Sequence, residues 1–186
     1  MKKKRCDWCE KDNLYRNYHD NEWGNPIYDD ETIFEFLVLE TFQAGLSWYT
    51  ILTKRENFRK AFNNFDFQKI AKYSNKKMEL LAQDSGIIRN KLKIKATVTN
   101  AQAFMKVQEE FGTFSKYIWG FVGGKPIDNK PKTLKDVPAT TEISDKLSKD
   151  LKKRGFKFVG STVVYAYMQA IGMVNDHIED CWKRNS

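Results

Sequence analysis

Helix signals run through most of the sequence, and no stretch alternates apolar and polar residues for long enough to build a sheet. The first strong helix is predicted from Glu31 to Ala44, after two aspartates and before Gly45. Further helices are predicted at 48–62, 67–73, 75–83, 90–111, 114–122, 142–154 and 161–174. Their expected N-caps include Ser47, Asp66, Ser74 and Asn90. The segment 123–141, which holds prolines, glycines and lysines, is predicted to be a surface loop. The sequence therefore predicts an all-α fold.

The charge balance restricts the class of partner. Among 186 residues, 32 Lys and Arg face 24 Asp and Glu, so the net charge is +8. This excess favours a polyanionic partner, nucleic acid first, although many domains are equally basic without binding one. No apolar run approaches the roughly 20 residues of a membrane span, and no apolar stretch follows the basic start of the chain. We therefore expect an intracellular, cytoplasmic protein of one compact unit, in which three cysteines do not form a disulfide framework.

The two histidines of the chain both lie near cysteines. His177 and Cys181 are four residues apart and would share one face of a helix, while Cys6 and His19 lie near the other end. Together they can form a closed Cys2His2 set, which would hold a structural zinc and join the two ends of the chain. The alternative is that buried cysteines and satisfied histidines lie there by coincidence. Cys9 adds a second ambiguity, because Cys6 and Cys9 have the spacing of a ligand pair themselves.

A short turn with one glycine separates the helices predicted at 75–83 and 90–111. It runs over 84–89 and contains Gly86. Backbone amides at the start of a helix suit a DNA phosphate, and positive charge follows at Arg89, Lys91, Lys93 and Lys95. The alternative is an ordinary helical turn with solvated lysines. A helix-hairpin-helix turn usually carries a second glycine, and here Ile88 and Arg89 stand in its neighbourhood.

One acid interrupts the apolar face predicted for the helix Glu31–Ala44. Residues 33, 36, 37, 40 and 44 share that face, and Glu40 is its charged member. A buried carboxylate is costly unless it is paired, so Glu40 either forms a salt bridge with a nearby lysine or arginine or waits in a pocket for a cationic ligand. Glu35 is expected on another face of the helix, in solvent.

Aromatic residues are dense in the segments around this helix: Trp8, Tyr15, Tyr18, Trp23, Trp48 and Tyr49. Most aromatic side chains pack into cores. Tyr15 and Tyr18 are one helical turn apart, however, and Trp48 follows the end of the Glu40 helix. These rings can form a stacking cage for a base that is flipped out of DNA.

Several separated segments share the pattern of one known family. They are Tyr18-His19-Asp20-Asn21-Glu22-Trp23-Gly24, Leu39-Glu40, Gln43-Ala44-Gly45-Leu46-Ser47-Trp48, Lys54-Arg55-Glu56-Asn57, Gly86-Ile87-Ile88-Arg89, Leu147-Ser148-Lys149 and Gly155-Phe156-Lys157-Phe158-Val159-Gly160 through Val174-Asn175-Asp176-His177. From about Cys6 to Cys181 the chain closely resembles the bacterial 3-methyladenine DNA glycosylase I family. The resemblance implies a helix-hairpin-helix glycosylase fold, with a helical lobe at about 30–115 that includes the hairpin at 84–89. It implies a zinc-binding lobe from about 1–29 plus 116–186.

The resemblance also assigns roles to individual residues. It selects Cys6, His19, His177 and Cys181 as the ligands of a structural zinc and leaves Cys9 as an extra thiol. It places Glu40 in the base pocket as the catalytic residue, and the surrounding substrate-binding residues are Trp8, Tyr15, Tyr18 and Trp48. The DNA contacts are expected at Leu46, Gly86, Arg89 and Lys91, where Leu46 is a candidate wedge for the emptied base stack.

The implied activity is DNA base-excision repair. A monofunctional N-glycosylase would hydrolyse the glycosidic bond of 3-methyladenine in double-stranded DNA, release the free base and leave an abasic site. The protein is expected to act as a monomer in the bacterial cytoplasm. Two other functions remain open from the residues alone. One is a helix-hairpin-helix DNA-binding module without activity, in which Glu40 pairs internally, and the other is a zinc-stabilised protein-interaction domain.

Overall fold

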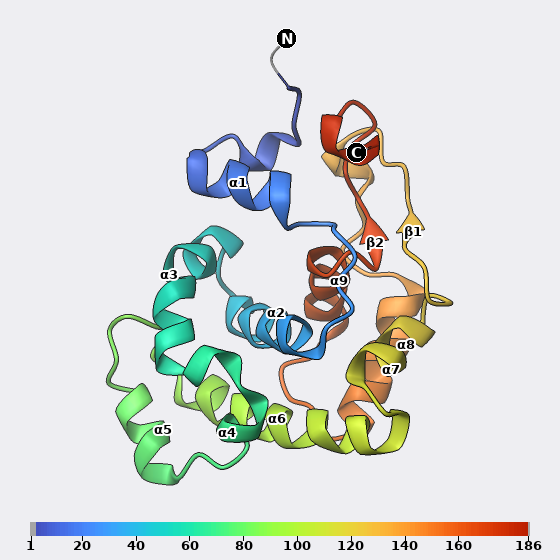
Figure 1. Cartoon of the computed structure of the whole chain (residues 1–186). Coiled ribbons are helices and arrows are strands. Elements are labelled where there is room, and N and C mark those ends of the chain that lie inside the picture. The colour runs from blue at the N-terminus through green and yellow to red at the C-terminus, as the bar shows by residue number, and fades with distance from the viewer. Residues whose placement is uncertain (1–2, 186) are drawn as a thin grey trace.

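The computed structural model describes residues 3–185, in which helices surround the central helix α2 (Figure 1). The α-helices are α1 Asn13–Asn21, α2 Asp30–Gln43, α3 Trp48–Ala61, α4 Phe67–Ile70, α5 Asn75–Leu81, α6 Lys91–Phe111, α7 Phe114–Gly120, α8 Glu142–Lys153 and α9 Ser161–Ala170. Short 3-10 helices cover Asp7–Cys9, Asn63–Phe65, Leu134–Asp136 and Trp182–Asn185. The fold is mainly helical, so the all-α prediction is confirmed for most of the described chain.

Side-chain caps explain where several of these helices begin. The predicted caps all accept a backbone amide of the first turn, and they are Ser47, Asp66, Ser74 and Asn90. Gly112 ends α6 with a φ of 86°, as expected. The helix predicted over 67–73 is shorter and ends at Ile70. Its last residues must turn into the extended backbone of Ser74, which opens α5.

The C-terminal part of the chain departs from the all-α prediction. The helix predicted over 161–174 ends at Ala170. Beyond it, β2 (Val174–Asn175) pairs in parallel with β1 (Ile127–Asp128). Gly172 turns the chain between α9 and β2 with a φ of 72°, and a Cβ atom there would lie 2.3 Å from the carbonyl carbon of Asn25. The N-terminal segment therefore crosses closely over the end of α9.

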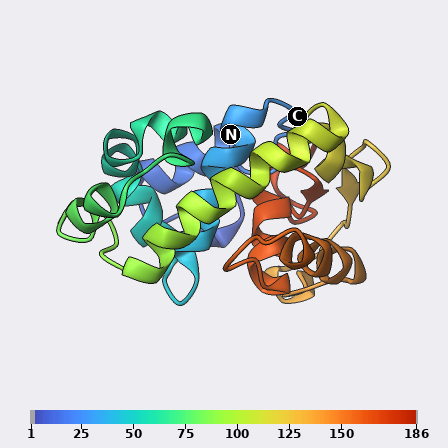
Figure 2. The ribbon, with the colours of Figure 1, turned by 90° about the horizontal axis from the view of Figure 1, so that it is seen from below.

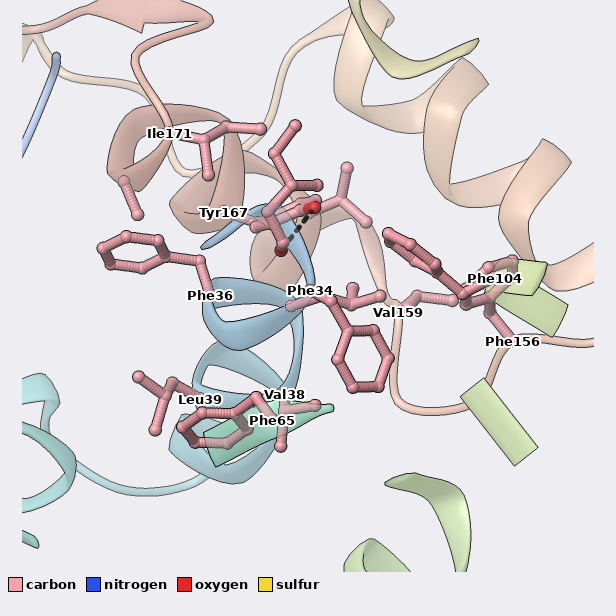
Figure 3. Packing of buried hydrophobic residues seen from close by; sticks show 14 of the residues in the cluster. Phe34, Phe36, Val38, Leu39, Phe65, Phe104, Phe156, Val159, Tyr167 and Ile171 are labelled. Carbon is pink, nitrogen blue, oxygen red and sulfur yellow. Dashed lines mark hydrogen bonds between the residues drawn. The ribbon is translucent and has the colours of Figure 1, made fainter. Parts of the chain in front are cut away.

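Helix α2 forms the centre of the hydrophobic core. Within it, the consecutive residues 36–42 are all buried, so its apolar residues surround the helix and do not form the single face that we predicted. Figure 3 shows Phe34, Phe36 and Val38 pointing in different directions from α2. The hydroxyl of Tyr167 donates a 3.0 Å hydrogen bond to the Ile33 carbonyl and joins α9 to α2. A helix covered on every side can hold a polar group only in a pocket or beside a partner.

Helix α6 crosses the molecule beneath the core (Figure 2). It packs against α2, α4, α5 and α7, so it connects the two sides of the molecule. Within residues 3–185 no helix combines the length and the apolar character that a membrane span requires.

Candidate functional site

A cavity of about 270 Å³ lies where α1, α2, α3 and α9 meet. Its lining residues are Trp8, Tyr15, Tyr18, Trp23, Glu40, Gln43, Trp48, Leu134, Val137, Ala166 and Gln169. The structure therefore brings together Glu40 and the four aromatic residues that the sequence placed around it. Tyr15 and Tyr18 lie one turn apart on α1, and Trp48 is the first residue of α3.

The aromatic walls of the cavity contact one another. The ring centroids of Trp8 and Tyr15 are 4.9 Å apart in an edge-to-face arrangement, and those of Tyr18 and Trp48 are 5.2 Å apart. Trp8 also meets Trp23 edge to face at 5.0 Å. These contacts hold the rings in fixed orientations, so their remaining faces and edges can surround a flat ligand.

Glu40 lies at the wall of this cavity without a protein partner. Glu40 is only 3% exposed, and its side chain makes no hydrogen bond or ion pair with any residue from 3 to 185. Burial raises the pKa of Glu40 to about 8. The predicted salt bridge to a lysine or arginine is therefore absent from the described structure. The buried indole N–H of Trp48 also lacks an acceptor there, so the cavity wall contains one unused acceptor and one unused donor.

Glu35, on the same helix, is paired with cationic side chains. The expectation that it is solvated is wrong, because its side chain is 12% exposed and contacts two arginines. Arg55 and Arg59 of α3 approach its Oε1 at 2.5 and 2.8 Å, and Arg55 also pairs with Glu22 at 2.5 Å. This network joins α1, α2 and α3 beside Tyr18. The pair of arginines four residues apart in α3 is the sequence signal of this network.

A second buried cluster joins the two ends of the chain. The ligand atoms of Cys6, His19, His177 and Cys181 all lie within 4.8 Å of one another, and all four residues are buried. The Cys181 sulfur lies 3.5 Å from Nε2 of His19 and 3.6 Å from Nδ1 of His177, and the Cys6 sulfur lies 3.8 Å from the same Nδ1. In a tetrahedral zinc site, a sulfur at about 2.3 Å and a nitrogen at about 2.0 Å from the metal are themselves about 3.5 Å apart. The cluster thus has the dimensions of a Cys2His2 metal site.

The partners behind the two histidines also fit a metal. Nδ1 of His19 lies 2.8 Å from Oδ1 of Asp20, and Nε2 of His177 lies 3.2 Å from the Trp23 carbonyl oxygen. The nitrogen facing the cluster is thereby left with its lone pair toward the metal position, as in ligating histidines. Arg5 donates three hydrogen bonds to Asp20 and, against the effect of burial, keeps the pKa of Asp20 at about 2. The residues present therefore fit a structural zinc.

Two expectations about this cluster need correction or extension. His177 and Cys181 do not share a helix face, because the chain between them is a turn after β2. Cys9 lies outside the set, as expected, and its thiol donates to the Cys6 carbonyl oxygen at 3.1 Å. Trp23 packs edge to face on His177 at 4.7 Å and also lines the cavity. The cluster and the cavity therefore share a wall.

The predicted DNA-contact residues lie at the surface. Leu46 is 42% exposed on the turn between α2 and α3, and Arg89 and Lys91 are exposed at the start of α6. The amide of Gly86 donates to Asp84 at 2.7 Å, and Asn90 caps the next amides of α6. The amides of Ile88, Arg89 and Lys91 have no acceptor within the described part of the chain. These three amides, and not that of Gly86, remain for an anion.

Lys93 does not belong to this exposed set. Only 5% of it is exposed, and its ammonium group donates to the carbonyl oxygens of Phe42 and Ala44 at 2.8 and 2.5 Å. Burial lowers the pKa of Lys93. Lys93 therefore caps the C-terminus of α2 and fixes the turn that carries Leu46, which corrects its place among the DNA-facing charges.

Several cavity residues were not predicted from the sequence. Trp23 belonged to the aromatic-rich segment but was not assigned to the pocket, and Gln43 lies one turn after Glu40 on α2. Leu134 and Val137 come from the loop predicted at 123–141, whose composition gave no sign that it folds over the cavity. Ala166 and Gln169 lie one turn apart on α9. Only the tertiary fold reveals these four residues.

A cavity walled by aromatic rings, with an unpaired buried acid in its wall, is typical of the class of proteins that bind a flat, electron-poor ring such as a nucleobase. Comparisons with known proteins define the family. The model of the methyladenine glycosylase family matches residues 8–184 of the chain. The chain therefore belongs to the methyladenine glycosylase family.

Individual relatives agree with this assignment. DNA-3-methyladenine glycosylase 1 of Escherichia coli K12 is 49% identical over 177 residues, which cover 95% of each chain. A crystal structure of 3-methyladenine DNA glycosylase I superposes with a TM-score of 0.93 at 49% identity and covers 96% of this chain and 98% of that one. A variant of 3-methyladenine DNA glycosylase I in complex with 3-methyladenine has a TM-score of 0.94 at 37% identity, with 97% of each chain covered.

Proposed function

We propose that the chain is a monofunctional DNA glycosylase that releases 3-methyladenine from alkylated double-stranded DNA. The observation that carries the proposal is the buried, unpaired carboxylate of Glu40 at an aromatic cavity. The family and the named activity of the Escherichia coli relative support it. The non-enzymatic DNA-binding alternative required an internal partner for Glu40, which the described structure does not contain.

Methylation at the 3 position makes adenine in DNA cationic, so the base is already a good leaving group and needs no proton from the enzyme. The protein has to extract the base, recognise it and admit water to the sugar. Glu40 accepts hydrogen bonds from the amino group of the base, and its negative charge favours the cationic base over ordinary adenine. Binding of a cation beside Glu40 also returns the carboxyl group to its ionised form, against the burial that raises its pKa.

The aromatic residues supply the remaining binding energy. Stacking on a ring contributes about 1–3 kcal/mol per base, which is comparable with the few kcal/mol needed to open a base pair. We propose Trp8, Tyr15, Tyr18 and Trp48 as the stacking walls. None of the described lining residues is a lysine, which supports hydrolysis by water without a covalent Schiff-base intermediate.

We propose that DNA lies across the turn between α5 and α6. The free amides near Arg89, together with the exposed charges of Arg89 and Lys91, would hold phosphates in a helix-hairpin-helix mode. Leu46, held next to α6 by Lys93, would enter the emptied stack as a wedge. In this arrangement residues 30–115 form a helical lobe with the hairpin at 84–89, and 1–29 with 116–186 form the second lobe.

The second lobe would contain one structural zinc bound by Cys6, His19, His177 and Cys181. Bound zinc would stabilise the fold by joining the two ends of the chain and would leave no position open for catalysis. The metal position would also support the cavity, because Trp23 contacts His177. We propose that the protein works as a monomer in a bacterial cytoplasm, in keeping with the bacterial source of the relative.

Release of free base from alkylated DNA tests the function. The full chain is incubated with DNA methylated by an alkylating agent, and released bases are separated by chromatography. We expect 3-methyladenine in the supernatant and abasic sites in the DNA without strand breaks. DNA binding without base release would support the non-enzymatic module instead, and neither binding nor release would support a protein-interaction domain.

A further inference from the structure

An exposed apolar surface lies on α6, about one turn beyond the proposed DNA-binding hairpin. A groove there is lined by Leu92, Lys95, Ala96, Thr99, Lys157 and Phe158. Leu92 is 70% exposed and Phe158 is 38% exposed, which is unusual for two large apolar residues that share one groove. We call these six residues the α6 groove. No role in the cavity or the metal cluster accounts for it.

The connector between α8 and α9 is built to present its middle residues to this groove. Phe156 and Val159 are 2% and 1% exposed and point into the core beside Phe104 (Figure 3). Between them, Lys157 and Phe158 point outward and are exposed. The pattern of two buried residues around two exposed ones fixes the connector at both ends.

A buried asparagine sets the conformation of the connector. Asn100 of α6 is fully buried, and its side-chain oxygen accepts the Lys157 amide at 2.8 Å while its nitrogen donates to the Lys157 carbonyl oxygen at 3.1 Å. The next residue, Phe158, has a φ of 55°, in the left-handed region that aromatic residues rarely adopt. Such a conformation persists only where the surroundings impose it, and it is common where a protein holds a ligand.

The charge of the α6 groove identifies the chemistry of its occupant. Lys95 and Lys157 line it, Lys91 precedes Leu92, and no acidic residue is among the described lining residues. These three lysines are exposed, and their ammonium groups make no ion pair or hydrogen bond with residues 3–185. Apolar surface beside unpaired cations fits a sugar-phosphate chain, whose sugars pack on apolar side chains while its phosphates contact lysines.

The position of the groove joins it to the proposed DNA surface. Helix α6 holds the Leu46 turn through Lys93. Two helical turns after Lys93, it holds the connector between α8 and α9 through Asn100. Figure 2 shows the start of α6, the turn between α2 and α3 and the connector along one side of the molecule. We infer that the α6 groove is a second DNA-contact surface that binds the sugar-phosphate backbone of a strand flanking the excised base. This inference rests on the proposed function.

Binding of the full chain to a DNA duplex with a stable abasic-site analogue tests the inference. Lys157→Gln should weaken binding about 2–10-fold and reduce the slope of log affinity against log salt by about one unit, the loss of one phosphate contact. Phe158→Ala and Leu92→Ala should weaken binding about 2–5-fold and leave the slope unchanged. Lys116→Gln, an exposed lysine on α7, is the matched control and should change neither quantity.

Three results separate the possibilities. If all three groove variants bind with the affinity and slope of Lys116→Gln, the inference is wrong and the groove serves another class of partner. A fall in the melting temperature of Lys157→Gln or Phe158→Ala would indicate a folding defect in that variant. In that case the DNA affinity of Leu92→Ala, a variant at an exposed position of α6, tests the inference by itself. Base release by the unaltered chain is measured on the same preparation. If it fails while the groove variants still weaken DNA binding, the proposed function is wrong and the DNA surface is supported.

Discussion

Two of the acids of α2, Glu35 and Glu40, lie five residues apart on the helix and in contrasting surroundings. Glu35 meets two arginines, one of which also holds Glu22, so its charge is fully paired. Glu40 is more deeply buried and meets none. A fold can carry the first kind of acid for stability, whereas the second is a cost unless a ligand supplies the missing partner. The comparison therefore separates a structural region from a functional one within a single helix.

The largest effect is expected at the buried cluster of Cys6, His19, His177 and Cys181, whose partner would be a zinc ion. Cys181→Ser should remove zinc and destabilise the fold by on the order of 5–10 kcal/mol, because metal binding is coupled to folding. Urea unfolding and elemental analysis measure both effects. Cys9→Ser is the control and should keep one zinc per chain, since Cys9 lies outside the cluster. Wild-type protein without zinc would exclude this account of the cluster.

Removing the partner of Glu35 should give the next largest effect. Arg55→Met leaves the buried carboxylate of Glu35 with a poorer partner and should destabilise the fold by about 3–5 kcal/mol. Arg59→Met removes the more exposed arginine, 33% exposed, and should cost no more than about 1 kcal/mol. Urea denaturation compares the two variants. Equal, small losses would mean that the network does not hold the three helices together.

The sequence predicted the fold well wherever local signals decide. Side-chain caps and glycine stops placed most helix boundaries within a few residues, because a cap is a local hydrogen bond. Prediction from the sequence failed where segments far apart in the chain contact each other. The end of α9 is set by the crossing of Asn25 over Gly172, and the ion pairs of Glu35 depend on how α3 packs on α2. No periodicity carries either piece of information.

The residues of the candidate site also divide into those that could be predicted from the sequence and those that could not. Residue types that are rare or unfavourable at their positions, such as the histidines and Glu40, could be recognised from the sequence. The cavity residues Leu134, Val137 and Ala166 could not, because ordinary apolar residues join a pocket only through tertiary contacts. Lys93 shows the reverse error, since a lysine in a basic run was assigned to the surface although it caps the end of α2.

Surface charges that contact neither Glu35 nor Glu40 should affect DNA binding and hardly affect stability. The double variant Arg89→Ala/Lys91→Ala should change the free energy of unfolding by about 0.5 kcal/mol or less. It should reduce the salt slope of DNA binding by about two units, one per lost phosphate contact. Lys106→Ala, an exposed lysine further along α6, is the control. An unchanged salt slope in the double variant would locate the DNA surface elsewhere.

The pH dependence of stability distinguishes Glu40 from a paired acid. Its folded pKa of about 8 lies above the ordinary value of 4.5, so between these pH values the folded chain keeps a proton that the unfolded chain has lost. The free energy of unfolding therefore falls as pH rises through this window. Glu40→Gln lacks the titration and should be more stable than the wild type by up to a few kcal/mol at pH 8, with the difference shrinking toward pH 4.5.

Melting temperature and single-turnover release of 3-methyladenine, measured on one preparation of Glu40→Gln at pH 8, test the central claim most directly. We predict a melting temperature equal to or above that of the wild type and excision slower by about 10–1000-fold, because the charged contact with the base is lost. A melting temperature well below that of the wild type, with near-normal excision per folded molecule, would show that Glu40 is a structural acid and contradict the account.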